Sequence, residues 1–207
     1  AQLIETLMDT IRKEVEACDS LQGFQLAHSL GGGTGSGLGT LIIAKLAEEY
    51  PDRIRQTFSV LPSLTDPELV IGSYNCILAL NHLVEDCDFV NVFDNDALFG
   101  ICNKSLELKS PTYNDVNRLI SHAMSGVTST LRFPGQLNSD LRKLKTSLVP
   151  SPKLHFLTVS LAPLTSSKID PNIEEISQQV FDPRNLLCSV DTSQGKYIAA
   201  AASYRSD

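Results

Sequence analysis

Residues 31–37, Gly-Gly-Gly-Thr-Gly-Ser-Gly, have the composition of a loop that binds phosphate. Five of the seven lack a Cβ atom, so the backbone is free to adopt positive φ and to bring its N–H groups against an anion. Residues 23–30 before the loop alternate as a strand does, and apolar residues follow from Leu38 at helical spacing. A glycine loop between a strand and a helix N-terminus predicts an anion site, with phosphate as the expected ligand.

The order of residues in this loop disfavours two common phosphate-binding motifs. A Walker loop ends in lysine followed by serine or threonine, and Leu38 occupies the lysine position. A Rossmann dehydrogenase is disfavoured too, because Ser36, Leu38 and Thr40 stand where the last glycine of G-x-G-x-x-G would be. A tight turn or a flexible linker is the alternative interpretation, which the flanking strand and helix patterns disfavour.

Composition excludes several classes of protein. The chain has 207 residues, of which 42% are hydrophobic, enough for one substantial core or for one domain and part of another. A net charge of −7 without a basic run predicts no nucleic-acid partner. Five scattered cysteines are typical of reduced thiols in a cytosolic protein, and the four histidines lack metal-ligand spacing. We expect no membrane span and no signal peptide.

Strand and helix patterns alternate along the first two thirds of the chain. Such alternation predicts an α/β fold with a mostly parallel sheet covered on both faces. Ligands of such folds bind beyond the carboxyl ends of the strands, so the loops at 31–37, 62–73 and 94–96 are expected to converge. The predicted strands are 23–30, 55–61 and 89–93, and the predicted helices are 2–17, 38–50, 73–86, 95–103 and 112–132.

A second unit is predicted to begin at Pro134, which ends the long helix. The chain is thereby divided into residues 1–133 and 134–207. The helical pattern begins at Ala1 without an initiator methionine or an N-cap, so we expect a piece of a longer chain. The elements predicted in the second unit are helices at 140–148 and 174–181 and strands at 154–161 and 197–203.

Several stretches of this chain resemble tubulins, and the similarity runs across essentially all of it. The resemblance covers about the middle half of a tubulin. It implies a partial Rossmann-like nucleotide-binding domain over 1–133, without its N-terminal strands, and the start of an α+β intermediate domain over 134–207. The most similar stretches are 29–37 (SLGGGTGSG), 21–28 (LQGFQLAH), 110–119 (SPTYNDVNRL) and 125–144 (SGVTSTLRFPGQLNSDLRKL).

Within the family, the sequence around Lys143 resembles that of β-tubulins. In α-tubulins a glutamate at this position orients the water that attacks the GTP of the neighbouring subunit, which a lysine is unable to do. The resemblance therefore implies that this chain does not trigger GTP hydrolysis in its neighbour. It also implies that GTP on this chain is hydrolysed only when an α-tubulin-like subunit stacks against it. In the alternative interpretation, Lys143 is simply a solvent-exposed charge on the surface of a helix. The longitudinal interface implied by the resemblance contains Gly135, Gln136, Asn138, Asp140 and Lys143.

The resemblance also implies a GTP site, with Mg²⁺ held mainly through the phosphates. The spacing of Tyr113 and Asn117 places both on one helix face even without the resemblance. Taken alone, Tyr113 could equally be a core aromatic residue and Asn95 a helix N-cap. The implied nucleotide contacts are Ser29, Gly33, Thr34 and Gly35 for the phosphates, Glu68 for the ribose, and Asn95, Tyr113 and Asn117 for guanine.

Two departures from the family pattern affect this interpretation. Near the ribose, Glu68 replaces the usual aspartate, and Gly72 stands where a second acid is expected. A lost hydrogen bond to a carboxylate costs about 1.5–3 kcal/mol, so GTP binding is expected to be weakened. After Thr165, residues 166–172 are shorter than the loop that β-tubulins use for lateral contacts between protofilaments.

The leading hypothesis is a β-tubulin-like, GTP-binding structural subunit of microtubules, located in the cytoplasm and the cytoskeleton. Its expected partners are an α-tubulin-like subunit and the microtubule lattice. Gly72 and the short loop after Thr165 leave open a second hypothesis, a non-polymerising relative that acts as an interaction protein. A metabolic enzyme is a third and disfavoured hypothesis, because no nucleophile–base set or pair of carboxylates stands at the predicted strand ends.

Overall fold

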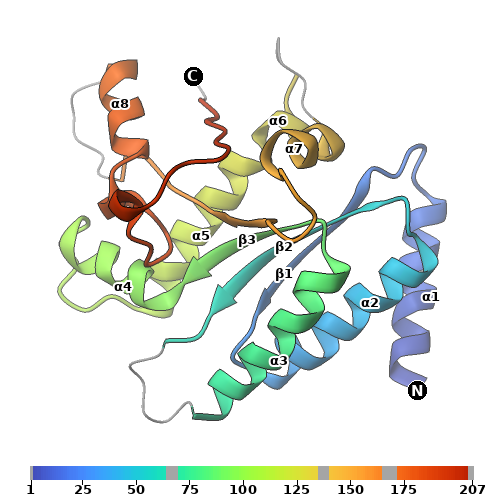
Figure 1. Ribbon diagram of the computed structural model, residues 1–207. Coiled ribbons are helices and arrows are strands. Elements are labelled where there is room, and N and C mark those ends of the chain that lie inside the picture. The colour runs from blue at the N-terminus through green and yellow to red at the C-terminus, as the bar shows by residue number, and fades with distance from the viewer. Residues whose placement is uncertain (1, 64–69, 135–139, 165–171, 205–207) are drawn as a thin grey trace.

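The computed structural model describes residues 2–63, 70–134, 140–164 and 172–204 (Figure 1). Its four strands form one parallel sheet in chain order: β1 (Gly23–Ser29), β2 (Ile54–Leu61), β3 (Phe89–Asp94) and β4 (Phe156–Thr158). Phe24 pairs with Arg55, Gln56 with Phe89, and Val90 with Phe156. The predicted α/β class with a parallel sheet is confirmed.

Helices cover both faces of the sheet (Figure 1). The helices α2 (Gly39–Glu49) and α3 (Val70–Asp86) pack on one face, and α4 (Asn95–Lys104) and α5 (Tyr113–Val127) pack on the other. The first helix, α1 (Gln2–Glu16), contacts α2 through an ion pair of 3.1 Å between Arg12 and Glu49. The remaining α-helices are α6 (Ser129–Arg132), α7 (Leu141–Leu148) and α8 (Ile173–Val180).

Side chains of the strands contribute to a hydrophobic cluster on each face of the sheet. Phe58 and Phe93 face α4 and α5, and their ring centroids lie 6.4 Å apart. Leu30 and Val90 face α2 and α3 on the opposite side. Each fully buried side chain of this size contributes about 1.5–3 kcal/mol to folding. These clusters hold the carboxyl ends of β1, β2 and β3 in a fixed arrangement.

Three predicted elements differ from the structure. The predicted helix 112–132 is divided at Thr128, whose hydroxyl donates to the Met124 carbonyl. The predicted strand 154–161 is reduced to β4. The predicted strand 197–203 is wrong, since these residues form no ladder in the described chain. The Tyr197 ring instead packs edge-on against Phe181, at 5.7 Å between centroids. Apolar alternation alone does not make a strand where no neighbouring strand offers hydrogen bonds.

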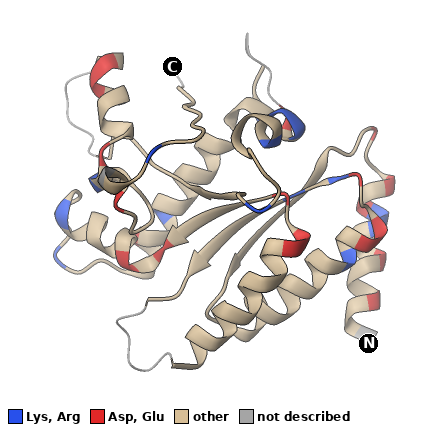
Figure 2. Ribbon diagram, viewed as in Figure 1, with Lys and Arg blue, Asp and Glu red and all other residues tan. Residues whose placement is uncertain are grey.

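Most of α3 contains no charged residue (Figure 2). Its only charged residues, Glu85 and Asp86, lie in its last turn. No helix in the described part of the chain has the length and apolarity needed to cross a membrane. The outward side of α3 carries exposed apolar residues that no other described element covers: Val70, Ile71, Tyr74, Ile77 and Leu78.

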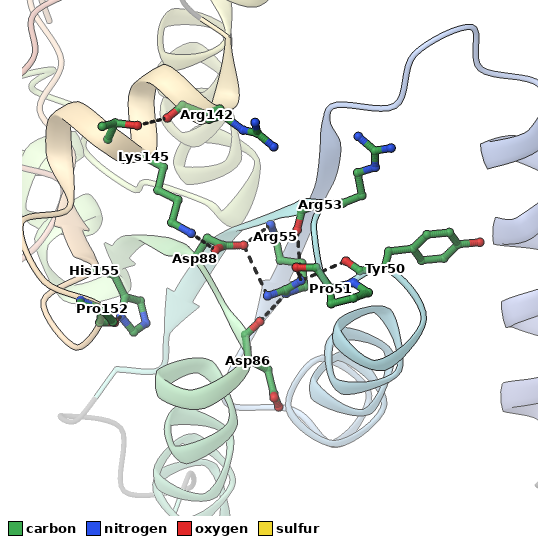
Figure 3. A network of polar contacts seen from close by, with 11 residues as sticks. Tyr50, Pro51, Arg53, Arg55, Asp86, Asp88, Arg142, Lys145, Pro152 and His155 are labelled. Carbon is green, nitrogen blue, oxygen red and sulfur yellow. Dashed lines mark hydrogen bonds and ion pairs between the residues drawn. The ribbon is translucent and has the colours of Figure 1, made fainter.

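A charged network joins α7 to the amino ends of β2 and β3 (Figure 3). Asp88 accepts hydrogen bonds from the Lys145 ammonium and from the Arg55 backbone N–H, the latter at 2.8 Å. The Arg55 guanidinium lies 3.6 Å from the same carboxylate and also donates to the Asp86 carbonyl at 2.7 Å. The Asp88 side chain is only 10% exposed. This network fixes the end of the sheet opposite the glycine loop.

Candidate functional site

The glycine loop leads from β1 directly into a helix. Residues Thr34–Leu38 form a π-helical turn that continues into α2. The first hydrogen bond of this helix joins the Ser36 N–H to the Gly32 carbonyl, at 3.1 Å. The N–H groups of residues 33, 34 and 35 precede that bond, and they have no backbone acceptor in the described chain. Gly33 and Thr34 are exposed, so their amides are open to an anion at the positive end of the helix.

Close approach of the backbone, rather than positive φ, explains the central glycine. No described glycine has positive φ, so that part of the prediction is wrong. A Cβ atom at Gly35 would lie 2.0 Å from the carbonyl oxygen of Ser29, the last residue of β1. At Gly39 a Cβ would lie 3.1 Å from the His28 Nδ1 atom. The first turns of the helix therefore rest directly on β1.

Three loops meet at the carboxyl edge of the sheet, as predicted. The Asn75 side chain of α3 donates to the Gly31 carbonyl at 3.0 Å. A Cβ atom at Gly31 would lie 3.0 Å from Pro62, which places the loop after β2 against the glycine loop. The Ser63 hydroxyl donates to Asp96, beyond β3. Convergence is thus confirmed for the described residues, whereas Glu68 lies outside them.

Asn95 lies at the start of α4 but does not cap it. The N-cap is Asp94, whose carboxylate accepts from the Asp96 N–H at 3.0 Å. The N-cap interpretation of Asn95 is therefore wrong. The Asn95 side chain is partly buried and makes no hydrogen bond to other described residues. Its amide is available to donate to and accept from a ligand.

Tyr113 and Asn117 lie exposed on one face of α5, as their spacing predicts. Tyr113 is 64% exposed, so the interpretation as a core aromatic is wrong. Its ring packs edge-on against Phe99 of α4, with 5.5 Å between centroids. Phe99 follows Asn95 by four residues on α4, so this contact brings the predicted guanine contacts of both helices to neighbouring faces. Sequence reasoning missed Phe99, although its distance from Asn95 in sequence could have indicated it.

The start of α5 is stabilised by a capping box. The Asp115 carboxylate accepts hydrogen bonds from the Thr112 N–H at 2.8 Å and from its hydroxyl at 2.7 Å. These two bonds lower the pKa of Asp115. The cap fixes the first turn of α5 and, with it, the position of Tyr113.

His28 is a second residue that sequence reasoning missed. It lies in β1 beneath the glycine loop, with Nδ1 at 2.8 Å from the Gly35 carbonyl and Nε2 at 2.8 Å from the Ser59 hydroxyl. Burial lowers the pKa of His28, and the bond to Gly35 opposes that shift only in part. The imidazole is therefore neutral at physiological pH.

Lowering the pH below 6.5 is expected to destabilise the protein through His28. Because its pKa is lower in the folded state than the ordinary value of 6.5, the unfolded chain binds the proton more readily. The contribution of neutral His28 to the free energy of unfolding is fully present above pH 6.5 and is lost as the pH falls toward the pKa of the folded state. Urea unfolding at pH 7.5 and pH 5.5 measures this, and a His28→Phe variant should lose less stability over that range. An equal loss in both proteins would contradict the assignment.

The predicted interface residues are only partly described. Asp140 caps α7 by accepting from the Lys143 N–H at 2.9 Å, and the Lys143 side chain is exposed. Gly135, Gln136 and Asn138 lie outside the described residues, as do residues 165–171 of the short loop. Among the described residues, no group of three His, Cys, Asp or Glu side chains is placed to hold a metal ion.

Two family models match the chain. Residues 1–103 match the GTPase domain of the Tubulin/FtsZ family, and residues 152–207 match the tubulin C-terminal domain. The first matched segment includes the glycine loop and Asn95, whereas Tyr113 and Asn117 lie between the two matched segments. Together the two matches span most of the chain. The division at Pro134 stays a prediction.

Proposed function

Because this chain belongs to the tubulin family, we propose that it is a β-tubulin-like subunit that binds GTP and pairs longitudinally with an α-tubulin-like chain. Membership of the family makes it a tubulin-like, GTP-binding cytoskeletal protein. The β assignment is supported by Lys143, which replaces the glutamate that α-tubulins present at this position. We place the protein in cytoplasmic microtubules on the same grounds.

The observation that carries the nucleotide proposal is the set of open amides at residues 33–35. They lie at the positive end of a helix, at the carboxyl edge of a parallel sheet, where α/β folds bind their ligands. These amides and the Thr34 hydroxyl donate to the β- and γ-phosphates, and Ser29 lies beside the α-phosphate. Mg²⁺ arrives with the phosphates, whose oxygens are ligands that it prefers.

The guanine base is held between α4 and α5. Tyr113 offers an exposed ring already oriented by Phe99, and Asn95 and Asn117 offer amides to the polar edge of the base. No residue of this chain is assigned as the base that activates water. Hydrolysis of GTP on this chain requires a carboxylate from the neighbouring subunit, whereas Lys143, as a cation, does not activate water at the neighbour's GTP.

Replacing Tyr113 with alanine is expected to reduce GTP affinity by about 5- to 150-fold, since stacking of a base on an aromatic ring contributes about 1–3 kcal/mol. Asn95→Ala should reduce the preference for GTP over ATP. Titration with a fluorescent GTP analogue, with ATP as competitor, measures both effects.

Tyr197→Ala is a matched control for Tyr113→Ala. Tyr197 is also exposed and also packs edge-on against a phenylalanine, at 5.7 Å between centroids, but it lies outside the proposed site. Its loss should leave GTP affinity unchanged. Absence of GTP binding in the wild-type protein, or equal affinity in both variants, would contradict the proposed site.

Gly72 favours a second candidate function, an interaction protein that does not enter microtubules. It lies buried in the first turn of α3, where it offers no side chain to the ribose. Co-sedimentation with α-tubulin separates the two functions. Recovery in the microtubule pellet supports the subunit, whereas GTP binding without recovery in the pellet supports the interaction protein.

A further inference from the structure

His28 links the glycine loop to the centre of the sheet. It pairs with Ser59 in the register of β1 and β2, so both side chains lie on the same face. Its Nδ1 atom lies 2.8 Å from the Gly35 carbonyl oxygen, inside the first turn of the helix that follows the loop. No other side chain of the described strands is hydrogen-bonded to residues 33–38.

The chemistry of the partners fixes where the protons lie. A carbonyl oxygen only accepts, so the Nδ1 atom of His28 carries a proton and donates to Gly35. Because burial lowers the pKa of His28, the ring is neutral and Nε2 is left as an acceptor. The Ser59 hydroxyl, 2.8 Å away, therefore donates to Nε2.

Ser59 is held in turn by a neighbour in β2. Its oxygen lies 3.1 Å from the Thr57 hydroxyl, and both residues are buried. The hydrogen bonds that matter for the loop thus run from Ser59 to His28 and from His28 to the Gly35 carbonyl.

We propose that His28, in its neutral form with the proton on Nδ1, is a positioning residue that anchors Gly35 to the sheet and so fixes the amides of residues 33–35 toward the phosphates. The inference rests on the proposed GTP site. His28 itself does not touch the nucleotide. It acts through the backbone of the loop, and Ser59 keeps its ring in the required tautomer.

The first test is the position of the proton. Nitrogen-15 NMR of the labelled protein at pH 7.5 should show His28 with a protonated Nδ1 and an unprotonated Nε2. Ser59→Ala should shift the ring toward a mixture of tautomers. The opposite tautomer in the wild-type protein would overturn the proposal.

The second test is the affinity for the fluorescent GTP analogue. His28→Phe keeps a ring but loses both hydrogen bonds, and it should bind at least tenfold more weakly. His28→Asn, whose amide N–H replaces Nδ1–H, should recover part of that loss, whereas His28→Gln should not. Affinity within twofold of wild type in a folded His28→Phe variant would overturn the proposal.

His155→Phe is the matched control. His155 is fully buried, and its ring nitrogens face the carbonyls of Pro152 and Leu83, away from the glycine loop. Its loss should lower stability but leave GTP affinity within twofold. If this variant or His28→Phe fails to fold, Ser59→Ala is compared with wild type, and a loss of threefold or more is expected. Unchanged affinity in Ser59→Ala would then overturn the proposal.

A third measurement separates this inference from the GTP proposal. If the wild-type protein does not bind the analogue, hydrogen exchange of the loop is measured without nucleotide. His28→Phe, or Ser59→Ala if it does not fold, should speed exchange of the Ser36 amide at least tenfold relative to the amides of α3. Such acceleration supports the anchor although the GTP site has failed, and unchanged exchange overturns the anchor itself.

Discussion

Gly35→Ala is expected to reduce GTP affinity at least a hundredfold, the largest effect that we anticipate at the site. The new Cβ atom would lie 2.0 Å from the Ser29 carbonyl oxygen and 3.0 Å from two further backbone atoms of Ser29. Ser29 is held in place because it pairs with Val60 of β2, and the next residue, Leu30, donates to the Val60 carbonyl at 2.9 Å. The loop must therefore move away, which costs at least about 1–3 kcal/mol and displaces the amides.

Gly37→Ala is the control for this effect. The same helical turn contains Gly37, yet a Cβ atom there meets nothing within 4 Å. Alanine is favoured over glycine in a helix by about 1 kcal/mol, so this variant should be as stable as wild type or more so and should bind GTP normally. Titration with the fluorescent analogue and urea unfolding measure both variants. Normal binding by Gly35→Ala would show that the loop is not held against β1.

The periodicity of apolar residues predicted most of the fold. Strands β1, β2 and β3 begin and end within one residue of the predicted bounds, because β1 alternates, β2 and β3 are largely buried, and glycine or a turn residue closely follows each of them. Predictions failed toward the C-terminus. Residues 197–203 alternate like a strand, but the Tyr204 hydroxyl bonds to Ser177 of α8 and the backbone has no ladder partner. The local alternation of apolar residues does not determine whether a distant segment is available to pair with a strand.

The candidate site, like the fold, was predicted from the sequence only in part. The glycine loop and the spacing of Tyr113 and Asn117 are local patterns, and the structure places them on the expected elements. The role of His28 depends on the register of β1 against β2, which brings Ser59 opposite it. Phe99 likewise gains its role only from the packing of α4 against α5. Contacts across elements require the assembled sheet and its helices.

Asp88→Ala is expected to lower the free energy of unfolding by about 3 kcal/mol. Removing one partner of a buried ion pair costs about 3–5 kcal/mol, because the remaining charges lose their counterion. The lower end applies here because Lys145 is 41% exposed and stays hydrated. The Arg55 side chain, in contrast, is largely buried and loses its only carboxylate partner in the described chain. Urea unfolding at pH 7.5 measures the change.

Two further variants separate buried charge from surface charge. Glu48→Ala removes an exposed ion pair with Lys45 on α2 and should cost less than about 1 kcal/mol. Lys145→Met removes only the link to α7, so its cost should lie between those of Glu48→Ala and Asp88→Ala. If Asp88→Ala costs no more than Glu48→Ala, the network does not stabilise the fold.

The same network bears on the proposed longitudinal contact. Lys145 lies on α7, the helix that Asp140 caps and that presents Lys143 to solvent. Without its bond to Asp88, α7 is held to the described part of the sheet by apolar contacts, chiefly through Leu141. Lys145→Met should therefore increase hydrogen exchange in α7 while leaving α2 and GTP affinity unchanged, since the glycine loop lies at the other end of the strands. Increased exchange in both helices would mean that Lys145 stabilises the whole fold rather than the position of α7.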